Sequence, residues 1–312
     1  MIRQVIDKSR DLYDLDLSTI VPITGKSYKG KISNGKEYFI KKTDNYMQEK
    51  FKFLYDQGID NILFPIRNRT GDFITKDEES YYITDYINDF YMLNEIKAVN
   101  LVNQLDKLHK NTFFKRQLTP STAKAKMDEI FLYLQYKYNT LEMYIRSLEE
   151  RPFDEFSIPI LKSYYIILDS KKTMADIQRR LISAIKEKKS VYFSYIHNNP
   201  KIDHLLISGG YQYLISIEHS KLGIPSLDIV KFYIENECCN VDMKSIITSY
   251  FSKFDDSFYY DYFCFMVILY YLKGITIIDK DYITTQSFVY ATESIKKFMD
   301  NYIQKETPPT DR

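Results

Sequence analysis

Tryptophan is absent from the 312 residues, and cysteine, histidine, glycine and proline are all scarce. The three cysteines, Cys238, Cys239 and Cys264, form an odd set with neither a Cys-x-x-Cys nor a Cys/His ligand spacing. This pattern argues against a disulfide framework and against a zinc site. We therefore expect a protein of a reducing compartment, the cytoplasm.

No excess of one charge is present either, because 43 Lys+Arg face 42 Asp+Glu and the formal charge is +1. Such a balance creates no net field toward nucleic acid or an anionic membrane. The longest apolar stretch, residues 262–272, is shorter than the roughly 20 residues of a membrane-spanning helix. We expect it to form a buried core helix, and we expect neither a nucleic-acid partner nor a membrane.

What the sequence does contain changes character along the chain. Residues 17–87 carry strand patterns, and the dipeptide Asn34-Gly35 between two alternating apolar runs predicts a tight hairpin. A helix is predicted from residue 45 to Gly58. Two further strands are expected, in the runs ILFPIR and SYYITDYI. The region should fold as a small antiparallel sheet of about five strands with one helix packed across it.

Long helical patterns follow, and they predict helices over residues 93–111, 121–150 and 159–189. Short strand patterns then surround Gly209-Gly210 and extend through the run YQYLISIEH, after which the chain is helical again. A β-rich lobe of residues 1–87 and a helical lobe of residues 88–312, joined near residues 85–90, is the outline of a bilobal, protein-kinase-like α+β fold.

Two patterns in the first lobe concern nucleotide binding. The stretch from Gly25 to Ile32 comes close to a Walker A loop, but Ile32 stands where Ser or Thr must reach magnesium, and a hairpin follows instead of a helix. Lys41 and Glu49 have the spacing of the strand lysine and helix glutamate of kinase-like folds, where the lysine meets the phosphates and the glutamate holds it. We expect these two side chains to form an ion pair, with Lys42 on the opposite face of the strand.

The order of several segments resembles the aminoglycoside phosphotransferase and choline kinase superfamily, and within it the CotS-type spore-coat proteins. The segments that carry this resemblance are YFIKK, SYYITDYI, LDKLHKN, YIHNNPKIDHLLI and YLISIEHSKLGIPSLDI. The resemblance covers nearly the whole chain. It implies a small antiparallel N-terminal lobe, a large helical C-terminal lobe and a phosphotransfer site built around the loop that begins at His197.

At that site the resemblance also shows departures. The family's loop places an Asp two residues after the His and an Asn five residues later, but this chain has Asn199 and His204 there. The family's metal-binding Asp is replaced by Ser216, while the acidic residue two positions later is retained as Glu218. An amide has no basic oxygen to accept a substrate proton, and a hydroxyl and an imidazole are poor magnesium ligands.

Two hypotheses follow from these substitutions. The first is a kinase-fold pseudoenzyme of the CotS type, a binding or structural protein with a protein partner such as another spore-coat protein. It would have no firm cofactor, and its only nucleotide contact would be weak, magnesium-independent ATP binding through Lys41. The second is an active small-molecule phosphotransferase with an atypical metal site. It would require Glu218, on the same side of a strand as Ser216, or Asp203 to hold the cation.

Overall fold

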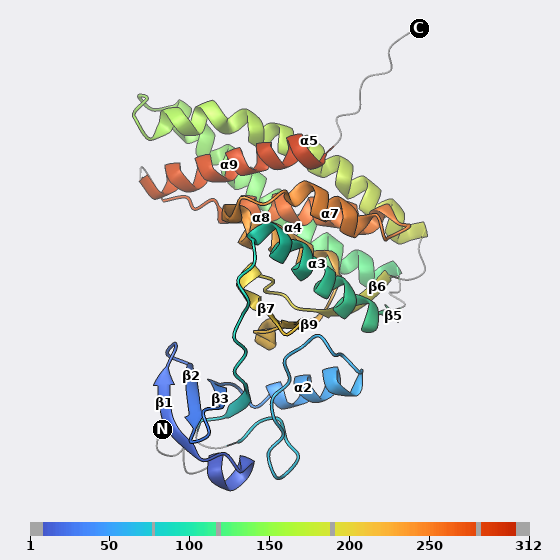
Figure 1. Cartoon of the computed structure of the whole chain (residues 1–312). Coiled ribbons are helices and arrows are strands. Elements are labelled where there is room, and N and C mark those ends of the chain that lie inside the picture. Colours follow the sequence, from blue (N-terminus) through green and yellow to red (C-terminus); the bar gives the residue numbers. More distant parts are fainter. Residues whose placement is uncertain (1–8, 77–78, 117–119, 188–190, 279–281, 304–312) are drawn as a thin grey trace. The chain divides into compact units, whose positions relative to one another are not determined.

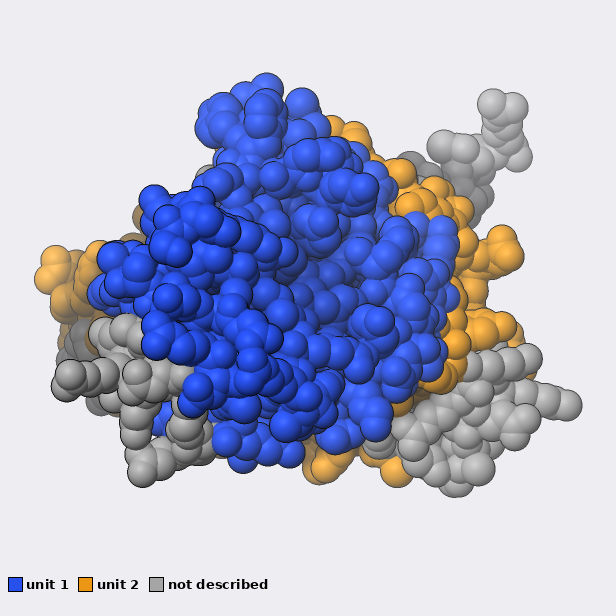
Figure 2. Space-filling view, turned by 60° about the horizontal axis from the view of Figure 1, so that its bottom comes forward, with its two compact units in different colours: residues 1–112, 197–221 blue, residues 113–196, 222–312 orange. Residues whose placement is uncertain are grey.

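The computed structural model describes residues 9–76, 79–116, 120–187, 191–278 and 282–303 (Figure 1). The chain divides into two compact units (Figure 2). One holds Met1–Thr112 with His197–Lys221, and the other holds Phe113–Ile196 with Leu222–Arg312. The first unit thus contains the expected small lobe together with the segment that begins at His197. The expected lobe boundary at residues 87 and 88 stays a prediction.

The first unit is built on an antiparallel sheet in the order β1-β2-β3-β4, with α2 beside it. Its helices and strands are β1 (Leu17–Pro22), β2 (Ser27–Ile32), β3 (Glu37–Lys42), α2 (Met47–Asp56), β4 (Tyr81–Asp85), α3 (Asn94–Asn111), β7 (Leu205–Ser208) and β8 (Tyr211–Leu214). The predicted hairpin at Asn34-Gly35 is confirmed, because Lys31 pairs with Glu37 and Gly35 has a φ of 90°. The hairpin around Gly209-Gly210 is confirmed as β7 and β8.

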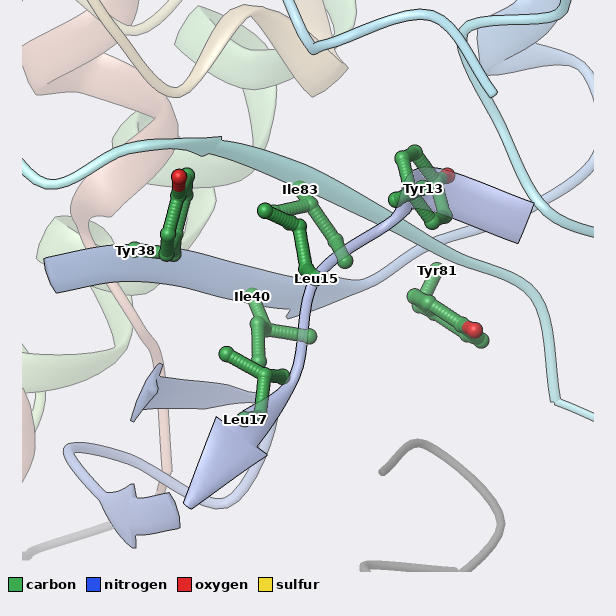
Figure 3. Close-up of a cluster of buried hydrophobic side chains, with 7 residues drawn as sticks. All are labelled: Tyr13, Leu15, Leu17, Tyr38, Ile40, Tyr81 and Ile83. Carbon is green, nitrogen blue, oxygen red and sulfur yellow. The ribbon is translucent and has the colours of Figure 1, made fainter. Parts of the chain in front are cut away.

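One face of the sheet carries a cluster of buried hydrophobic side chains. Side chains from β1, β3 and β4 gather there with residues of the segment that precedes β1, as Figure 3 shows. The members of this cluster are Tyr13, Leu15, Leu17, Tyr38, Ile40, Tyr81 and Ile83. Since side chains alternate along a strand, the residues between them point to the other face. Lys41 and Tyr82 therefore share the face opposite to this cluster.

Two strand predictions are wrong. The run ILFPIR forms no strand: Ile62 makes an isolated parallel bridge with Leu214, and Pro65 has no N–H with which to continue a ladder. The sheet consequently has four strands instead of five. The run YQYLISIEH is a strand only as far as Leu214, because Ser216 adopts a left-handed backbone with φ of 59° and Ile217–His219 forms a turn of 3₁₀ helix, η2.

The second unit is largely helical, as the long helical patterns predicted. Its helices are α4 (Pro120–Glu149), α5 (Ser157–Glu187), α6 (Ser226–Glu235), α7 (Met243–Phe251), α8 (Ser257–Gly274) and α9 (Tyr282–Tyr302). Helix α5 packs against α4, α8 and α9 (Figure 1). Residues 262–272 lie within α8 and are mostly buried, which confirms the predicted core helix. No helix in the described ranges is long and apolar enough to cross a membrane.

A small sheet in the order β5-β6-β9 accompanies these helices, with β5 (Phe114–Arg116), β6 (Val191–Ile196) and β9 (Lys221–Gly223). Gly223 lies so close to β6 that a Cβ atom at this position would be 2.7 Å from Cδ1 of Ile196. Only glycine permits this approach without a shift of the neighbouring side chain.

Candidate functional site

Lys41 and Tyr82 converge on one carboxylate within the first unit. The two residues are register partners on β3 and β4, so their side chains leave the sheet side by side. Lys41 Nζ lies 2.6 Å from Oε1 of Glu218, and the Tyr82 hydroxyl donates a 3.0 Å hydrogen bond to the same oxygen. The sheet lysine expected to meet phosphate is therefore paired with an acidic side chain of the turn η2.

The expected ion pair between Lys41 and Glu49 is not formed, and this prediction is wrong. Successive residues of a helix rotate by about 100°, and the buried side of α2 carries Met47, Gln48, Phe51 and Leu54. Glu49 lies on the opposite, exposed side. The expectation for Lys42 is confirmed, because its ammonium pairs at 2.9 Å with Glu79 instead of turning toward Lys41's partner.

A second lysine, Lys50 of α2, fixes the turn that carries Glu218. Its Nζ donates to the backbone carbonyl of Glu218 at 2.6 Å and to that of Ser220 at 2.7 Å. Burial lowers the pKa of Lys50 below its ordinary value, although the charge of Glu218 opposes this shift. The Ser220 hydroxyl also donates to the carbonyl of Ile217 at 2.5 Å. The backbone of η2 is thus held from α2 and from within.

Glu218 does not follow a continuous strand from Ser216, as the prediction that placed the two on the same side requires. In a strand, residues two apart face the same side. Because Ser216 is left-handed and η2 follows it, the alternation of a strand does not apply here. Glu218 instead reaches Lys41 and Tyr82.

The loop that begins at His197 is joined to the segment before η2 by imidazole hydrogen bonds. His197 Nδ1 accepts the backbone N–H of Asn199 at 3.3 Å, so its Nε2 carries the proton and donates to the carbonyl of Ile215 at 2.8 Å. His204 Nδ1 donates to the carbonyl of Asn199 at 2.7 Å, and the N–H of Ile215 donates to the carbonyl of His204. The predicted residues Asn199, His204 and Ser216 therefore come from segments that are hydrogen-bonded to one another.

The charge states of this region follow from burial and from the neighbouring charges. Burial opposes ionisation of Glu218, but the charge and hydrogen bond of Lys41, with further hydrogen bonds, lower the pKa of Glu218 below its ordinary value. Burial lowers the pKa of His204, and its hydrogen bond to Asn199 opposes this shift without cancelling it. At neutral pH Glu218 is thus an anion, whereas His204 is a neutral imidazole.

The donors in this region do not fit a magnesium ion. Magnesium prefers oxygen ligands, carboxylates above all, in octahedral geometry. Ser216 offers a hydroxyl, His204 a nitrogen, and Glu218 a carboxylate already bound to Lys41 and Tyr82. Among the residues with described placement, no group of three or more His, Cys, Asp or Glu side chains is arranged to hold a metal ion.

Comparison with known proteins identifies the fold. No protein-family model and no curated protein matches the sequence. Among solved structures, an aminoglycoside phosphotransferase from Alicyclobacillus acidocaldarius has a TM-score of 0.62 and 12% identity, over 96% of this chain and 95% of that one. A spectinomycin phosphotransferase in complex with ADP and spectinomycin has a TM-score of 0.52 and 16% identity, over 95% and 93%. This chain therefore has the kinase-like fold of the aminoglycoside phosphotransferases, which confirms the predicted fold class.

Sequence reasoning missed two residues of this site, Tyr82 and Lys50. Tyr82 lies in a strand that was predicted, but the register between β3 and β4 depends on the long connection between them and is not readable from either strand. Lys50 follows Glu49 directly in the predicted helix. The helical spacing of the apolar residues in the sequence already places Lys50 nearer to the buried side of the helix than Glu49, so Lys50 could have been predicted from it.

Proposed function

We propose that this chain is a kinase-fold protein that acts by binding and does not transfer phosphate. The observation that carries the proposal is the pairing of Glu218 with Lys41. Glu218 is the acidic residue retained two positions after Ser216, which stands in the place of the family's metal-binding Asp. Its carboxylate is bound to a lysine and a tyrosine. The substitutions at Asn199, His204 and Ser216 point in the same direction, because they remove a proton acceptor and two metal ligands.

Nucleotide binding in this proposal is weak and independent of magnesium. A lysine and backbone N–H groups hold phosphate without a cation, as in many anion sites. Lys41 supplies the charge, and among the residues that the structure describes no cluster of three or more His, Cys, Asp or Glu side chains is arranged to draw a divalent cation into the site. ADP should therefore bind equally in magnesium and in EDTA, as measured by isothermal titration calorimetry.

The decisive comparison uses a variant in which the family's residues are restored, Asn199→Asp/His204→Asn/Ser216→Asp. Its affinity for ADP should rise in magnesium while that of the natural sequence does not change. A natural sequence that needs magnesium for binding would contradict the proposal, since it would show that Glu218 leaves Lys41 to hold the cation. Melting temperatures without ligand serve as the control for folding of the variant.

The place of action proposed here is the spore coat, with another coat protein as the partner. The resemblance to CotS-type proteins supports this part of the proposal. Antibodies against the chain should detect it in coat extracts of purified spores from its source organism. Detection only in the mother-cell lysate, and not in the coat, would contradict it.

A further inference from the structure

The Glu218 carboxylate is surrounded by the kind of donors that form an anion-binding site. Here the bound anion is the side chain of Glu218 itself. Lys41 and Tyr82 donate to the same carboxylate oxygen, Oε1, and Lys50 donates to the backbone carbonyl of the same residue. An ammonium group and a hydroxyl from neighbouring strands that converge on one oxygen are an arrangement with which proteins also bind a phosphate oxygen. In this chain the oxygen belongs to Glu218.

Glu218 is held in this position by its backbone as well as by its side chain. Lys50 binds the carbonyls on both sides of His219, and Asn198 Nδ2 donates to the carbonyl of His219 itself at 2.9 Å. Little backbone entropy therefore remains for residue 218 to lose when its side chain meets Lys41. An internal carboxylate fixed in this way competes with any free anion at a high effective concentration.

The two side chains of the pair are also partly withdrawn from water, with exposed fractions of 21% for Lys41 and 18% for Glu218. Partial burial strengthens the attraction between the charges relative to a surface pair. A phosphate group that approaches Lys41 would meet the negative charge of Glu218 at contact distance. It would bind only if that carboxylate moved away or lost its charge.

We propose that Glu218 is an internal competitor for polyphosphate at Lys41, so that this carboxylate, and not a poor fit of the site, limits anion binding. The inference rests on the proposed function, because it concerns magnesium-independent binding at the same lysine. It assigns to the retained acidic residue a role in excluding a ligand. The ligand class is an extended polyphosphate, as in a nucleoside di- or triphosphate.

The test measures binding of inorganic tripolyphosphate in EDTA by isothermal titration calorimetry. Glu218→Gln should bind at least about tenfold more tightly than the natural sequence, because Lys41 is released while the shape of residue 218 is kept. The matched control is Glu49→Gln, which removes the same charge from an exposed position nearby, on α2. This control should bind like the natural sequence, and Lys41→Met/Glu218→Gln should lose the gain.

Equal binding by Glu218→Gln and Glu49→Gln would overturn the inference, and so would a gain that survives in the double variant. If Glu218→Gln does not fold, Glu218→Asp replaces it. This substitution keeps the charge but withdraws the carboxylate from Lys41 by one methylene, and it should still bind more tightly than the natural sequence. Unchanged binding by Glu218→Asp would then overturn the inference. The assay contains neither magnesium nor a phosphate acceptor. A negative result would therefore overturn only this inference, whereas phosphotransfer, measured separately, would overturn the proposed function.

Discussion

Lys41 on β3 and Glu218 on η2 form an ion pair with 2.6 Å between Nζ and Oε1, and Tyr82 shares the same oxygen. This contact joins the small antiparallel sheet to the segment that follows the β7–β8 hairpin. It also engages the lysine that the sequence pattern predicts to meet phosphate, by its resemblance to kinase-like folds. The function proposed for this chain depends on that contact more than on any other.

The first prediction concerns the stability of the pair. Glu218→Gln should lower the free energy of unfolding by about 1–3 kcal/mol at neutral pH, because Lys41 loses a charged hydrogen-bond partner. Urea unfolding measures the loss. Glu49→Gln, at an exposed position, should change the free energy of unfolding by less than about 0.5 kcal/mol. Equal effects of the two substitutions would contradict the account.

The pair should also make stability depend on pH. The pKa of Glu218 is lowered from 4.5 in the folded state, so its contribution is fully present above pH 4.5 and is lost as pH falls through the folded pKa. The difference in stability between the natural sequence and Glu218→Gln should therefore shrink on acidification. Urea unfolding repeated over this pH range tests it, and a difference that stays constant would show that Glu218 titrates normally.

A third prediction separates two lysines of α2. Lys50→Met should destabilise the chain by about 1–3 kcal/mol, since the carbonyls of Glu218 and Ser220 lose their charged donor. Amide hydrogen exchange at residues 217–220 should become faster. Lys52→Met, on the exposed side of the same helix, is the matched control and should alter neither measurement. Unchanged exchange in Lys50→Met would mean that the turn does not need this lysine.

A fourth prediction tests the close approach in the second unit. Gly223→Ala should cost about 1–3 kcal/mol, because its Cβ would lie 2.7 Å from Cδ1 of Ile196. The double variant Gly223→Ala/Ile196→Val lacks that Cδ1 atom and should cost less than the sum of its two single substitutions. Gly25→Ala, whose Cβ meets no atom within 4 Å, should have little effect. Strict additivity would exclude the predicted clash.

Some elements of the fold could be predicted from the sequence and others could not. The Asn34-Gly35 hairpin, the helix that ends before Gly58 and the buried helix at residues 262–272 follow from local patterns, and the structure contains all three. The run ILFPIR was wrongly predicted to be a strand from its apolar residues, although Pro65 has no N–H to donate to a neighbouring strand.

The candidate site was harder to predict than the fold. The partner of Lys41 is Glu218, which is remote in sequence and lies in a turn that the apolar pattern of YQYLISIEH presented as a strand. Glu49 was predicted to be the partner of Lys41 from its spacing alone. It lies on the exposed side of the helix and does not pair with Lys41. Contacts between distant segments depend on register and turn conformation, which a local pattern does not specify.

The most direct test of the central claim is transfer of the γ-phosphate. The purified chain would be incubated with radiolabelled ATP, magnesium and a panel of aminoglycosides, choline and other small alcohols, beside the variant Asn199→Ala. The account predicts no transfer above background by either protein, because an amide at position 199 cannot accept the proton of a substrate hydroxyl. Robust transfer that Asn199→Ala abolishes would contradict the account and would mean that Glu218 leaves Lys41 to serve the reaction.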